Sequence, residues 1–277
     1  MNAKSKRIVS QIALNAVIVL LLFLMIYPLA FAVWNAFKSG DGYRYTRWYP
    51  TLPLHIANIG TAWSVTYRWM FNTVFVGVLG TAGMLFLSSM ASFAFAKLRF
   101  PGKSIFFSMV IVLMMIPSVL TLIPSYLQYK AFGMYDSHLA LILPIWTAGC
   151  IFSVFLTTSF FSGLPKDIFE ATQIDGGTKW HCYLHIAVPL SVPILSTIAI
   201  MQLINTWNDY LWPSLLLPTE EKLTISAGLI LFCRGEYSSN YPLQFAGYLV
   251  ASTPLIVLFI GCNKFYIQGL VSSGIKM

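Results

Sequence analysis

The sequence predicts an all-α integral membrane protein, and three observations support this fold class. Hydrophobic residues make up 57% of the 277 residues and charged residues only 9%, whereas soluble domains carry roughly 25% charged residues. The mean hydropathy is +0.74, so the chain has too little polar surface to coat a water-soluble particle. Six long apolar segments account for most of this hydrophobicity, and each is near the ~20 residues that cross a bilayer. We therefore expect a single transmembrane domain over residues 1–277.

The six predicted spans follow one another along the chain, and each can cross about 30 Å of hydrocarbon at roughly 1.5 Å per helical residue. The first begins after Lys4, Lys6 and Arg7, as a signal peptide would. Its apolar run is too long for a signal sequence and no A-x-A cleavage pattern follows, so we expect it to be retained as a span. The spans are predicted at residues 12–37, 70–96, 104–127, 139–161, 186–211 and 245–265.

Residues inside the spans predict local helix geometry. Gly77, Gly80 and Gly83 in the second span would let another helix approach closely. A shorter apolar run over residues 223–232 is too short to span and fits an interfacial or re-entrant helix. Prolines are tolerated in membrane bundles but kink a helix, and we expect kinks at Pro28, Pro117, Pro144, Pro193 and Pro254.

The distribution of lysine and arginine predicts the orientation in the membrane. With the N-terminus in the cytoplasm, ten of the 17 basic residues lie on the cytoplasmic side and seven lie outside, in agreement with the retention of Lys and Arg inside. The tight basic turn over residues 97–103 is the clearest cytoplasmic signal, and six spans return the C-terminus to the cytoplasm. The net charge of +8 thus flanks the membrane instead of forming one basic face, which argues against nucleic-acid binding.

The connection between the fourth and fifth spans, residues 164–185, differs from the other connections and lies on the predicted cytoplasmic side. Pro165 suits a first helical turn, and early carboxylates favour the positive end of a helix dipole. Gly176 and Gly177 allow a sharp reversal before a second helix, which begins near Thr178 and continues into the fifth span. Such an amphipathic segment suits either a groove on another protein or the lipid surface, and its residue pattern does not separate the two.

This connection resembles a motif of the inner-membrane permeases of bacterial ABC importers, which reads E-A-A, three residues, G, nine residues, I-x-L-P. Here Glu170-Ala171-Thr172 is followed after three residues by Gly176, and after nine more by Ile186-Ala187-Val188-Pro189. The spacing agrees at every element. Thr172 and Val188 depart from the motif, and both keep small or apolar character.

The resemblance extends over nearly the whole chain and points to the maltose-transporter-like, oligosaccharide branch of this family. The turn Leu98-Arg99-Phe100-Pro101-Gly102-Lys103 looks like the short inside turn of carbohydrate-importer permeases. Asn205 and the run Trp207-Asn208-Asp209-Tyr210-Leu211-Trp212-Pro213 resemble the family's W-N-D/E-F-x-W-P stretch. Residues 268–276 are similar to its G-L-T-A-G-A-V-K ending. The first span and the first outer loop carry less of the resemblance.

The resemblance implies a type I ABC importer permease fold, with six transmembrane helices and a cytoplasmic coupling helix, as a multi-pass protein of the bacterial inner (plasma) membrane. It also implies the partners: a second homologous permease subunit, two ABC ATPase subunits that bind ATP and Mg, and an extracytoplasmic solute-binding protein. The residues that would couple to the ATPase are Glu170, Ala171, Thr172, Asp175, Gly176 and Gly177, with tail contacts from Gly274 and Lys276.

No catalytic residue, metal site or cofactor is expected in this chain. It has neither a G-x-x-x-x-G-K-[ST] loop nor a G-x-S-x-G elbow, so the ATPase must be another polypeptide. His181 and His185 lie four residues apart, but H-E-x-x-H is absent and no third ligand is near.

Four residues near the end of the fifth span are candidates for the translocation path: Asn205, Trp207, Asn208 and Asp209. An acid at membrane depth is a functional hypothesis by default, and amides beside an indole suit the hydroxyls and ring faces of a sugar. The alternative is that Asp209 faces outer water or caps a helix while the tryptophans belong to the interfacial belt. In the maltose-type arrangement the other permease holds most of the sugar.

The sequence therefore predicts the permease subunit of an ATP-driven importer for an oligosaccharide or another carbohydrate. An ABC permease for another solute, such as a glycerol phosphodiester or a polyamine, is one alternative. An ion-coupled secondary transporter is another, but few acids lie in the spans and no inverted repeat with broken helices is evident. An intramembrane enzyme would need a catalytic set that the sequence lacks.

Overall fold

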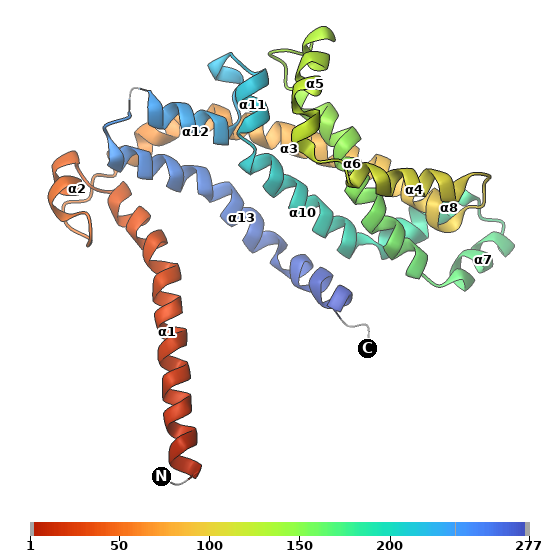
Figure 1. Cartoon of the computed structure of the whole chain (residues 1–277), viewed down its shortest axis with the longest axis horizontal. Helices are drawn as coiled ribbons and strands as arrows, with labels where there is room; N and C mark the ends of the chain where they lie inside the picture. The colour runs from red at the N-terminus through yellow and green to blue at the C-terminus, as the bar shows by residue number, and fades with distance from the viewer. Residues whose placement is uncertain (1–2, 236, 275–277) are drawn as a thin grey trace. The chain divides into compact units, whose positions relative to one another are not determined.

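The computed structural model describes residues 3–235 and 237–274, and it places side chains at residues 11–235 and 237–262. Within this part of the chain every regular element is a helix, as the sequence predicts (Figure 1).

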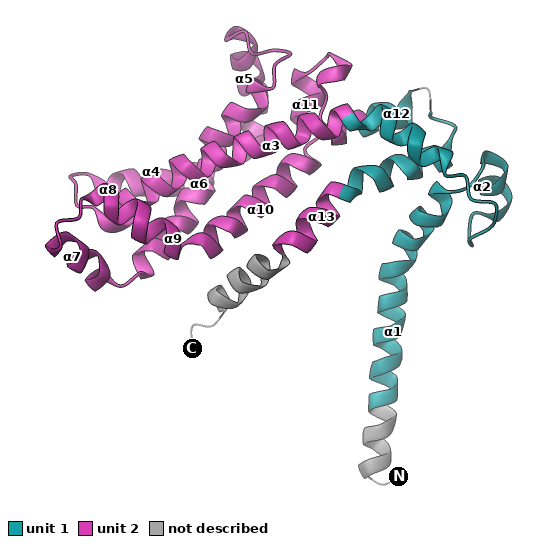
Figure 2. Cartoon of the chain, turned by 180° about the vertical axis from the view of Figure 1, so that it is seen from behind, with its two compact units in different colours: residues 1–67, 229–253 teal, residues 68–228, 254–277 magenta. Residues whose placement is uncertain are grey.

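Internal contacts divide the chain into two compact units (Figure 2). Unit 1 consists of Met1–Tyr67 and Leu229–Thr253, and unit 2 consists of Arg68–Gly228 and Pro254–Met277. The predicted functional residues of the middle of the chain all belong to unit 2.

Four helices are each long and apolar enough to cross a bilayer. They are Gln11–Ala36 within α1 (Ala3–Ala36), α3 (Ala57–Lys97), α6 (Leu139–Gly163) and Tyr241–Cys262 within α13 (Tyr241–Gly274). Two further pairs of helices are equally apolar but bent, so the described residues supply six spans when each bent pair counts as one. In α1 the most apolar window is 0% buried by the protein, so lipid is the natural solvent for that helix.

The third predicted span is bent instead of continuous. Helices α4 (Lys103–Met114) and α5 (Ser118–Ala131) meet at 97°. Helix α4 closes with two tight turns, in which the N–H groups of Met115 and Ile116 donate to carbonyls three residues back. Pro117 follows with extended backbone. Because proline disfavours a helical conformation at the residue before it, the helix stops and restarts here.

The fifth predicted span also differs from the structure in its continuity and its end. Helix α8 (Lys179–Cys182), a π-helical turn η1 (Tyr183–Ala187) and α9 (Val188–Leu190) lead into α10 (Val192–Asn208) through a bend of 72°. Prolines at positions 189 and 193 cannot donate to the preceding turn, which accounts for the widened turn and the bend. Asp209 has extended backbone, so α10 ends before residue 211.

Close packing around α6 forms the centre of unit 2. Helix α6 contacts α4, α10 and α11 (Leu211–Leu216). On α3, a Cβ atom at Gly80 would lie 2.6 Å from Ile145, and one at Gly83 would lie 2.2 Å from Trp146. The indole N–H of Trp146 donates to the carbonyl of Leu79 at 3.0 Å. The predicted close approach at the glycines of the second span is therefore confirmed.

A buried lysine organises the loop after α1 in unit 1. Lys38 is 2% exposed, and its ammonium donates to the carbonyls of Thr46, at the end of α2 (Gly40–Thr46), and of Tyr49. Carbonyl oxygens thus replace the water that the charge loses on burial. Unit 1 also contains most of α12 (Ile225–Arg234), a ten-residue helix at the position of the short apolar run.

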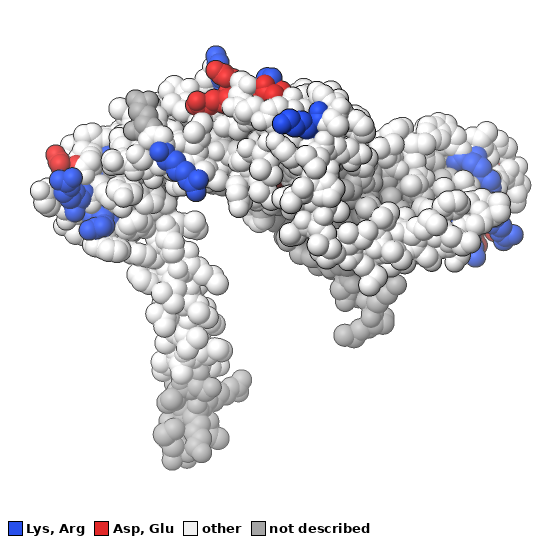
Figure 3. Space-filling model, turned by 45° about the horizontal axis from the view of Figure 1, so that its top comes forward, with Lys and Arg blue, Asp and Glu red and all other residues white. Residues whose placement is uncertain are grey.

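On the face that Figure 3 shows, the charged side chains of the described residues of unit 2 gather toward its two ends. One end contains the start of α4 together with α7 (Lys166–Ile174), and we call it the α7 end. The other contains α11 and the short 3-10 turn η2 (Glu220–Lys222), and we call it the α11 end. This distribution is the one expected of a unit whose middle lies in hydrocarbon.

We predict that Gly83→Ala lowers stability, although alanine is the better helix former, because the added methyl would overlap the Trp146 ring. Overpacking of this kind costs about 1–3 kcal/mol. Gly60→Ala is the matched control, since the same change on the same helix meets no atom within 4 Å. Thermal unfolding in detergent should show a lower midpoint for Gly83→Ala only; equal midpoints for the two variants would refute the packing.

Candidate functional site

Helix α7 ends in a hydrogen-bonded turn that requires glycine at two adjacent positions, Gly176 and Gly177. The N–H of Gly177 donates to the Thr172 carbonyl at 2.8 Å, and the N–H of Gly176 donates to the Gln173 carbonyl at 3.2 Å. This pair of bonds defines a Schellman motif. Gly176 has φ +86°, which side chains other than glycine adopt at a cost. A Cβ atom at Gly177 would lie 2.7 Å from the Thr172 carbonyl oxygen, so neither position accepts a larger residue without strain.

One aromatic side chain anchors α7 to the ends of the long helices. Phe169 is 5% exposed and packs in a cluster with Phe93 of α3, Phe161 of α6 and Tyr183 of η1. The ring centroids of Phe169 and Phe93 are 6.3 Å apart. The Lys97 ammonium lies 4.6 Å from the centroid of the Phe169 ring and donates to the Leu164 carbonyl at 2.8 Å. Burying a phenylalanine contributes about 1.5–3 kcal/mol, which a nine-residue helix needs because it is marginal on its own.

The predicted coupling residues divide into an exposed group and a structural pair. The exposed group consists of Glu170, Ala171, Asp175 and Gly176. Thr172 and Gly177 are half-buried, and they face each other within the turn. Helix α7 therefore leaves free the surface that a partner would contact.

A second capping interaction sets the start of α8. The Thr178 hydroxyl accepts the N–H of His181 at 3.1 Å, as an N-cap residue does. The Lys179 ammonium donates to the Gln173 side-chain oxygen at 2.5 Å and so ties α8 back to α7. The rings of His181 and His185 stack at 4.3 Å; within the described residues no group of three metal-ligating side chains occurs.

A cleft of about 530 Å³ opens in unit 2 between α6, α10 and α11. Of the four residues predicted for the translocation path, Asn205 and Asp209 line this cleft. Gln202 and Trp212 also line the cleft, and the sequence analysis did not name them as candidates for the translocation path. The signal for Gln202 was present, because positions 202, 205 and 209 recur at i, i+3 and i+7 and so share one face of a helix.

Two predicted path residues do not line the cleft. Trp207 is 9% exposed, and its carbonyl accepts the Ser226 hydroxyl at 2.5 Å. The Asn208 side chain is turned back on its own helix and donates to the Ile204 carbonyl at 2.9 Å.

Asp209 acts as a helix cap, which the sequence analysis gave as the alternative to a role in the translocation path. One carboxylate oxygen accepts the N–H groups of Leu211 at 3.1 Å and Trp212 at 3.3 Å, which caps α11. The same residue lines the cleft. The cap thus holds the Asp209 carboxylate and the Trp212 side chain next to each other in the chain, and both residues line the cleft.

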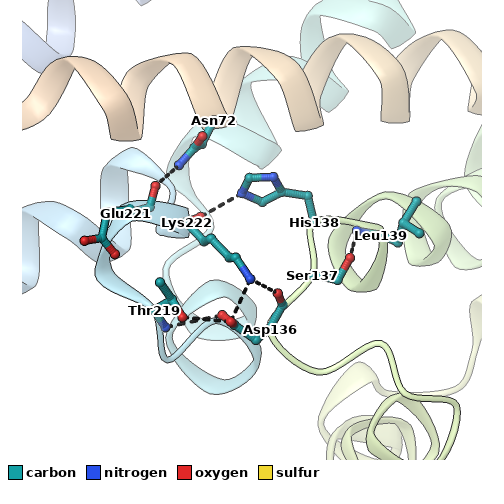
Figure 4. A network of polar contacts seen from close by, with 8 residues as sticks. All are labelled: Asn72, Asp136, Ser137, His138, Leu139, Thr219, Glu221 and Lys222. Carbon is teal, nitrogen blue, oxygen red and sulfur yellow. Dashed lines mark hydrogen bonds and ion pairs between the residues drawn. The ribbon is translucent and has the colours of Figure 1, made fainter.

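A polar network joins three segments at the α11 end (Figure 4). The Lys222 ammonium lies 2.7 Å from the Asp136 carboxylate, which also accepts the Thr219 hydroxyl at 2.7 Å. His138 donates to the Lys222 carbonyl at 2.8 Å. On α3, the Asn72 amide donates to the Glu221 carbonyl at 2.7 Å. The network ties the α5–α6 connection and the segment after α11 to α3.

Together, the helical spans, the described charges gathered toward the two ends of unit 2 and the exposed short helix at one of these ends define a multi-pass membrane protein. Its cleft has a largely apolar lining with a few polar side chains. Residues 84–270 match the family described as binding-protein-dependent transport system inner membrane component. The chain belongs to this family. It is therefore a component of a transport system that works with a solute-binding protein, which removes the basis for an ion-coupled secondary transporter.

Similar proteins support the assignment. The chain is 31% identical over 213 residues to the arabinooligosaccharides transport system permease protein AraQ of Bacillus subtilis (strain 168), covering 77% of this chain and 75% of AraQ. It is 26% identical to the diacetylchitobiose uptake system permease protein NgcG of Streptomyces coelicolor, covering 94% and 87%. A crystal structure of a bacterial ABC transporter involved in the import of the acidic polysaccharide alginate has a chain with the same fold. That chain has a TM-score of 0.83 and 20% identity, over 96% of this chain and 99% of that one.

The predicted tail contacts fall at the edge of the described chain. Gly274 is the last residue of α13, and Lys276 lies outside the described residues.

We predict an acid-sensitive contribution from Asp136. The Lys222 ammonium and then the Thr219 hydroxyl hold the pKa of Asp136 below its ordinary value of 3.8. A carboxyl whose pKa is depressed by folding stabilises the fold above the unfolded pKa, and this contribution is lost as the pH falls through the lowered value. Asp136→Asn should therefore lower the thermal midpoint slightly at pH 7. Between pH 5 and pH 2, roughly the range of that titration, the midpoint of the variant should fall less than that of the natural chain.

Asp41→Asn is the control, since this exposed carboxylate has no ion pair within the described part of the chain. Its midpoint should follow the natural chain at every pH. If the midpoint of Asp136→Asn falls on acidification by as much as that of the natural chain, the prediction is contradicted.

Proposed function

We propose that this chain is the permease subunit of an ATP-driven importer whose solute is a carbohydrate, most simply an oligosaccharide. The observation that carries the solute class is the agreement among relatives, whose names specify arabinooligosaccharides, diacetylchitobiose and galactooligosaccharides. The cleft supports it, because Gln202, Asn205 and Asp209 offer hydrogen-bonding groups beside the Trp212 ring. Amides and carboxylates can pair with sugar hydroxyls, and an indole presents a face on which a sugar ring packs.

Helix α7 is the proposed contact with the ATPase. Glu170 is an exposed residue in the middle of α7, and the exposed Gly176 forms the turn after it; Phe169 anchors this helix to α3, α6 and η1. A force on α7 would therefore act on the long helices and not only on a loose loop. ATP binding on the partner could then shift the permease between inward-open and outward-open states, as a ligand shifts any two-state equilibrium toward the state it binds better.

The proposed assembly has one copy of this chain, a second homologous permease, two ATPase subunits that bind ATP and Mg, and an extracytoplasmic solute-binding protein. This chain takes part in no chemical step of ATP hydrolysis. Both termini lie in the cytoplasm of a bacterial cell, with α7 on the same side. The basic residues at the α7 end, three of them in the turn over residues 97–103, support this orientation.

We predict that coupling depends on Glu170 and Gly176. A tagged natural chain, solubilised gently, should co-purify with a second permease and an ATPase. Glu170→Arg combined with Gly176→Pro should lose the ATPase and keep the permease. Arginine reverses the exposed charge, and proline fixes φ near −65° where the turn needs +86°.

The charge-matched control is Glu220→Arg, which alters an exposed glutamate in η2, at the opposite end of unit 2. It should retain both partners. If the natural chain purifies without an ATPase in several mild detergents, or if the double variant retains it fully, the coupling proposal fails.

We predict that the cleft contributes to solute passage. In proteoliposomes that contain the complete transporter, Asn205→Ala should lower uptake of labelled maltotriose or arabinotriose, whichever is transported, by about fivefold, because one hydrogen bond contributes about 1 kcal/mol. Asn208→Ala is the matched control, since its side chain bonds within its own helix. Equal uptake by the two variants would remove this chain from the solute path. Uptake of glycerophosphocholine or spermidine, with no sugar transported, would move the solute to the alternative classes.

A further inference from the structure

A basic hollow lies beside α7, between that helix, the end of α3 and the start of α4. Its volume is about 800 Å³. Five cations line it against a single carboxylate, Glu170; the cations are Lys97, Arg99, Lys103, Lys166 and Lys179. Blue side chains mark this end of unit 2 in Figure 3.

The cations of the hollow have no acidic partner within the described residues. The ion pair found within the described residues joins Lys222 to Asp136, and it lies at the α11 end of unit 2, not in the hollow. Lys97 and Lys103 donate to neutral carbonyls, at 2.8 Å and 3.2 Å, and Lys179 donates to the amide oxygen of Gln173. Lys97 and Lys103 are half-buried. Half-buried ammonium groups of like sign in one hollow repel each other, so an anion between them would be stabilised by all of them.

The face of α4 that starts beside the hollow is apolar. Helix α4 begins at Lys103, and its residues Phe106, Met109 and Leu113 are 54%, 54% and 47% exposed. They lie three and four residues apart, the first of them one turn after Lys103, and therefore form one stripe along the helix. The stripe belongs to α4, which is the first half of a bent pair that meets the criterion for a membrane span, so it leads from the basic hollow into the hydrocarbon region.

We propose that the hollow binds the phosphate headgroup of an anionic phospholipid whose acyl chain lies along the apolar stripe of α4. One molecule then satisfies both features: its negative charge lies among the cations, and its chain covers the exposed side chains. An acidic surface of a soluble protein would match the cations but would leave the stripe uncovered. Basic pockets between transmembrane helices on the cytoplasmic side are suited to anionic headgroups. The proposal uses the orientation proposed above but not the solute or the ATPase contact.

The site also has a consequence for α7. Lys97 and Lys166 line the hollow together with Phe169, the residue that anchors α7, and the Lys97 ammonium lies 4.6 Å from the centroid of the Phe169 ring. A phosphate that neutralises these lysines would reduce the repulsion between them and hold α7 against α3. Anionic lipid would thus stabilise the segment proposed to contact the ATPase.

The test is a lipid-binding measurement on the purified full chain. Native mass spectrometry would count molecules of phosphatidylglycerol and phosphatidylcholine that remain bound as each lipid is titrated into the delipidated protein. We expect a preference for phosphatidylglycerol. The variant Arg99→Gln/Lys103→Gln/Lys166→Gln should weaken its binding by roughly tenfold to a hundredfold, because each basic residue near an anionic headgroup contributes a few-fold. Arg44→Gln/Arg47→Gln/Lys130→Gln, which removes three charges that do not line the hollow, should leave it unchanged.

Two further arms distinguish the sources of the anion. Phe106→Ala/Met109→Ala should weaken binding of long-chain phosphatidylglycerol but not of the dihexanoyl form, which has almost no chain to cover the stripe. Inorganic phosphate at millimolar concentration should not displace the long-chain lipid. Displacement by phosphate, or no effect of the stripe variant, would show a site for a soluble anion and overturn the lipid.

A third outcome concerns proteins. If the triple hollow variant binds phosphatidylglycerol as the natural chain does but no longer co-purifies with the ATPase, the cations serve a protein partner and the lipid proposal is overturned. That result would leave the coupling role of α7 intact. Conversely, loss of lipid with normal ATPase capture supports the lipid site whatever happens to the coupling variants. Circular dichroism at 222 nm checks that each variant keeps its helices.

Discussion

The burial of Phe169 between α3, α6 and η1 is the contact on which the α7 end of unit 2 depends. The Phe93 ring contacts the Phe169 ring, and Tyr183 contacts Phe93 within the same cluster. Lys97 lies over the Phe169 ring and donates to the Leu164 carbonyl before α7. A nine-residue helix cannot be stable by itself, since helix nucleation is costly. The Schellman turn closes its C-terminal end, but only the aromatic contact determines where the helix lies. Both the exposed coupling surface and the basic hollow follow from that position.

Proline supplies the second constraint. Within the bilayer each backbone group needs an internal partner, so helix breaks are tolerated only where other groups supply one. At Pro117 the chain leaves α4 and starts α5 in a new direction. After α10, Asp209 takes over the role of partner, because its carboxylate accepts the first free N–H groups of α11. The break there places Trp212 across from the polar face of α10 and so shapes the cleft.

The two features with proposed functions share the same supports. Helix α6 lines the cleft through Pro144, Ile145 and Gly149 and contributes Phe161 to the cluster that anchors α7. Helix α10 carries Gln202 and Asn205 and follows directly from η1 and α9. A displacement of α7 and a change in the cleft would therefore involve the same two helices. Helix α6 packs closely on α3 at Gly80 and Gly83, and α10 packs on α3 at Gly77, so independent movement is resisted.

The sequence by itself determined the class of protein, the approximate spans, the family motif and the turn at Gly176 and Gly177, because hydropathy, motif spacing and glycine preference are properties of neighbouring residues. Asn205 and Asp209 were predicted on the path for the same reason. Only the tertiary structure decided which side chains face one another. It turned Asn208 back on its helix, buried Trp207, and brought Gln202 and Trp212 to the cleft. It also gathered lysines from four separate helices around one hollow. Such groupings depend on contacts between residues far apart in the chain, and no local pattern encodes them.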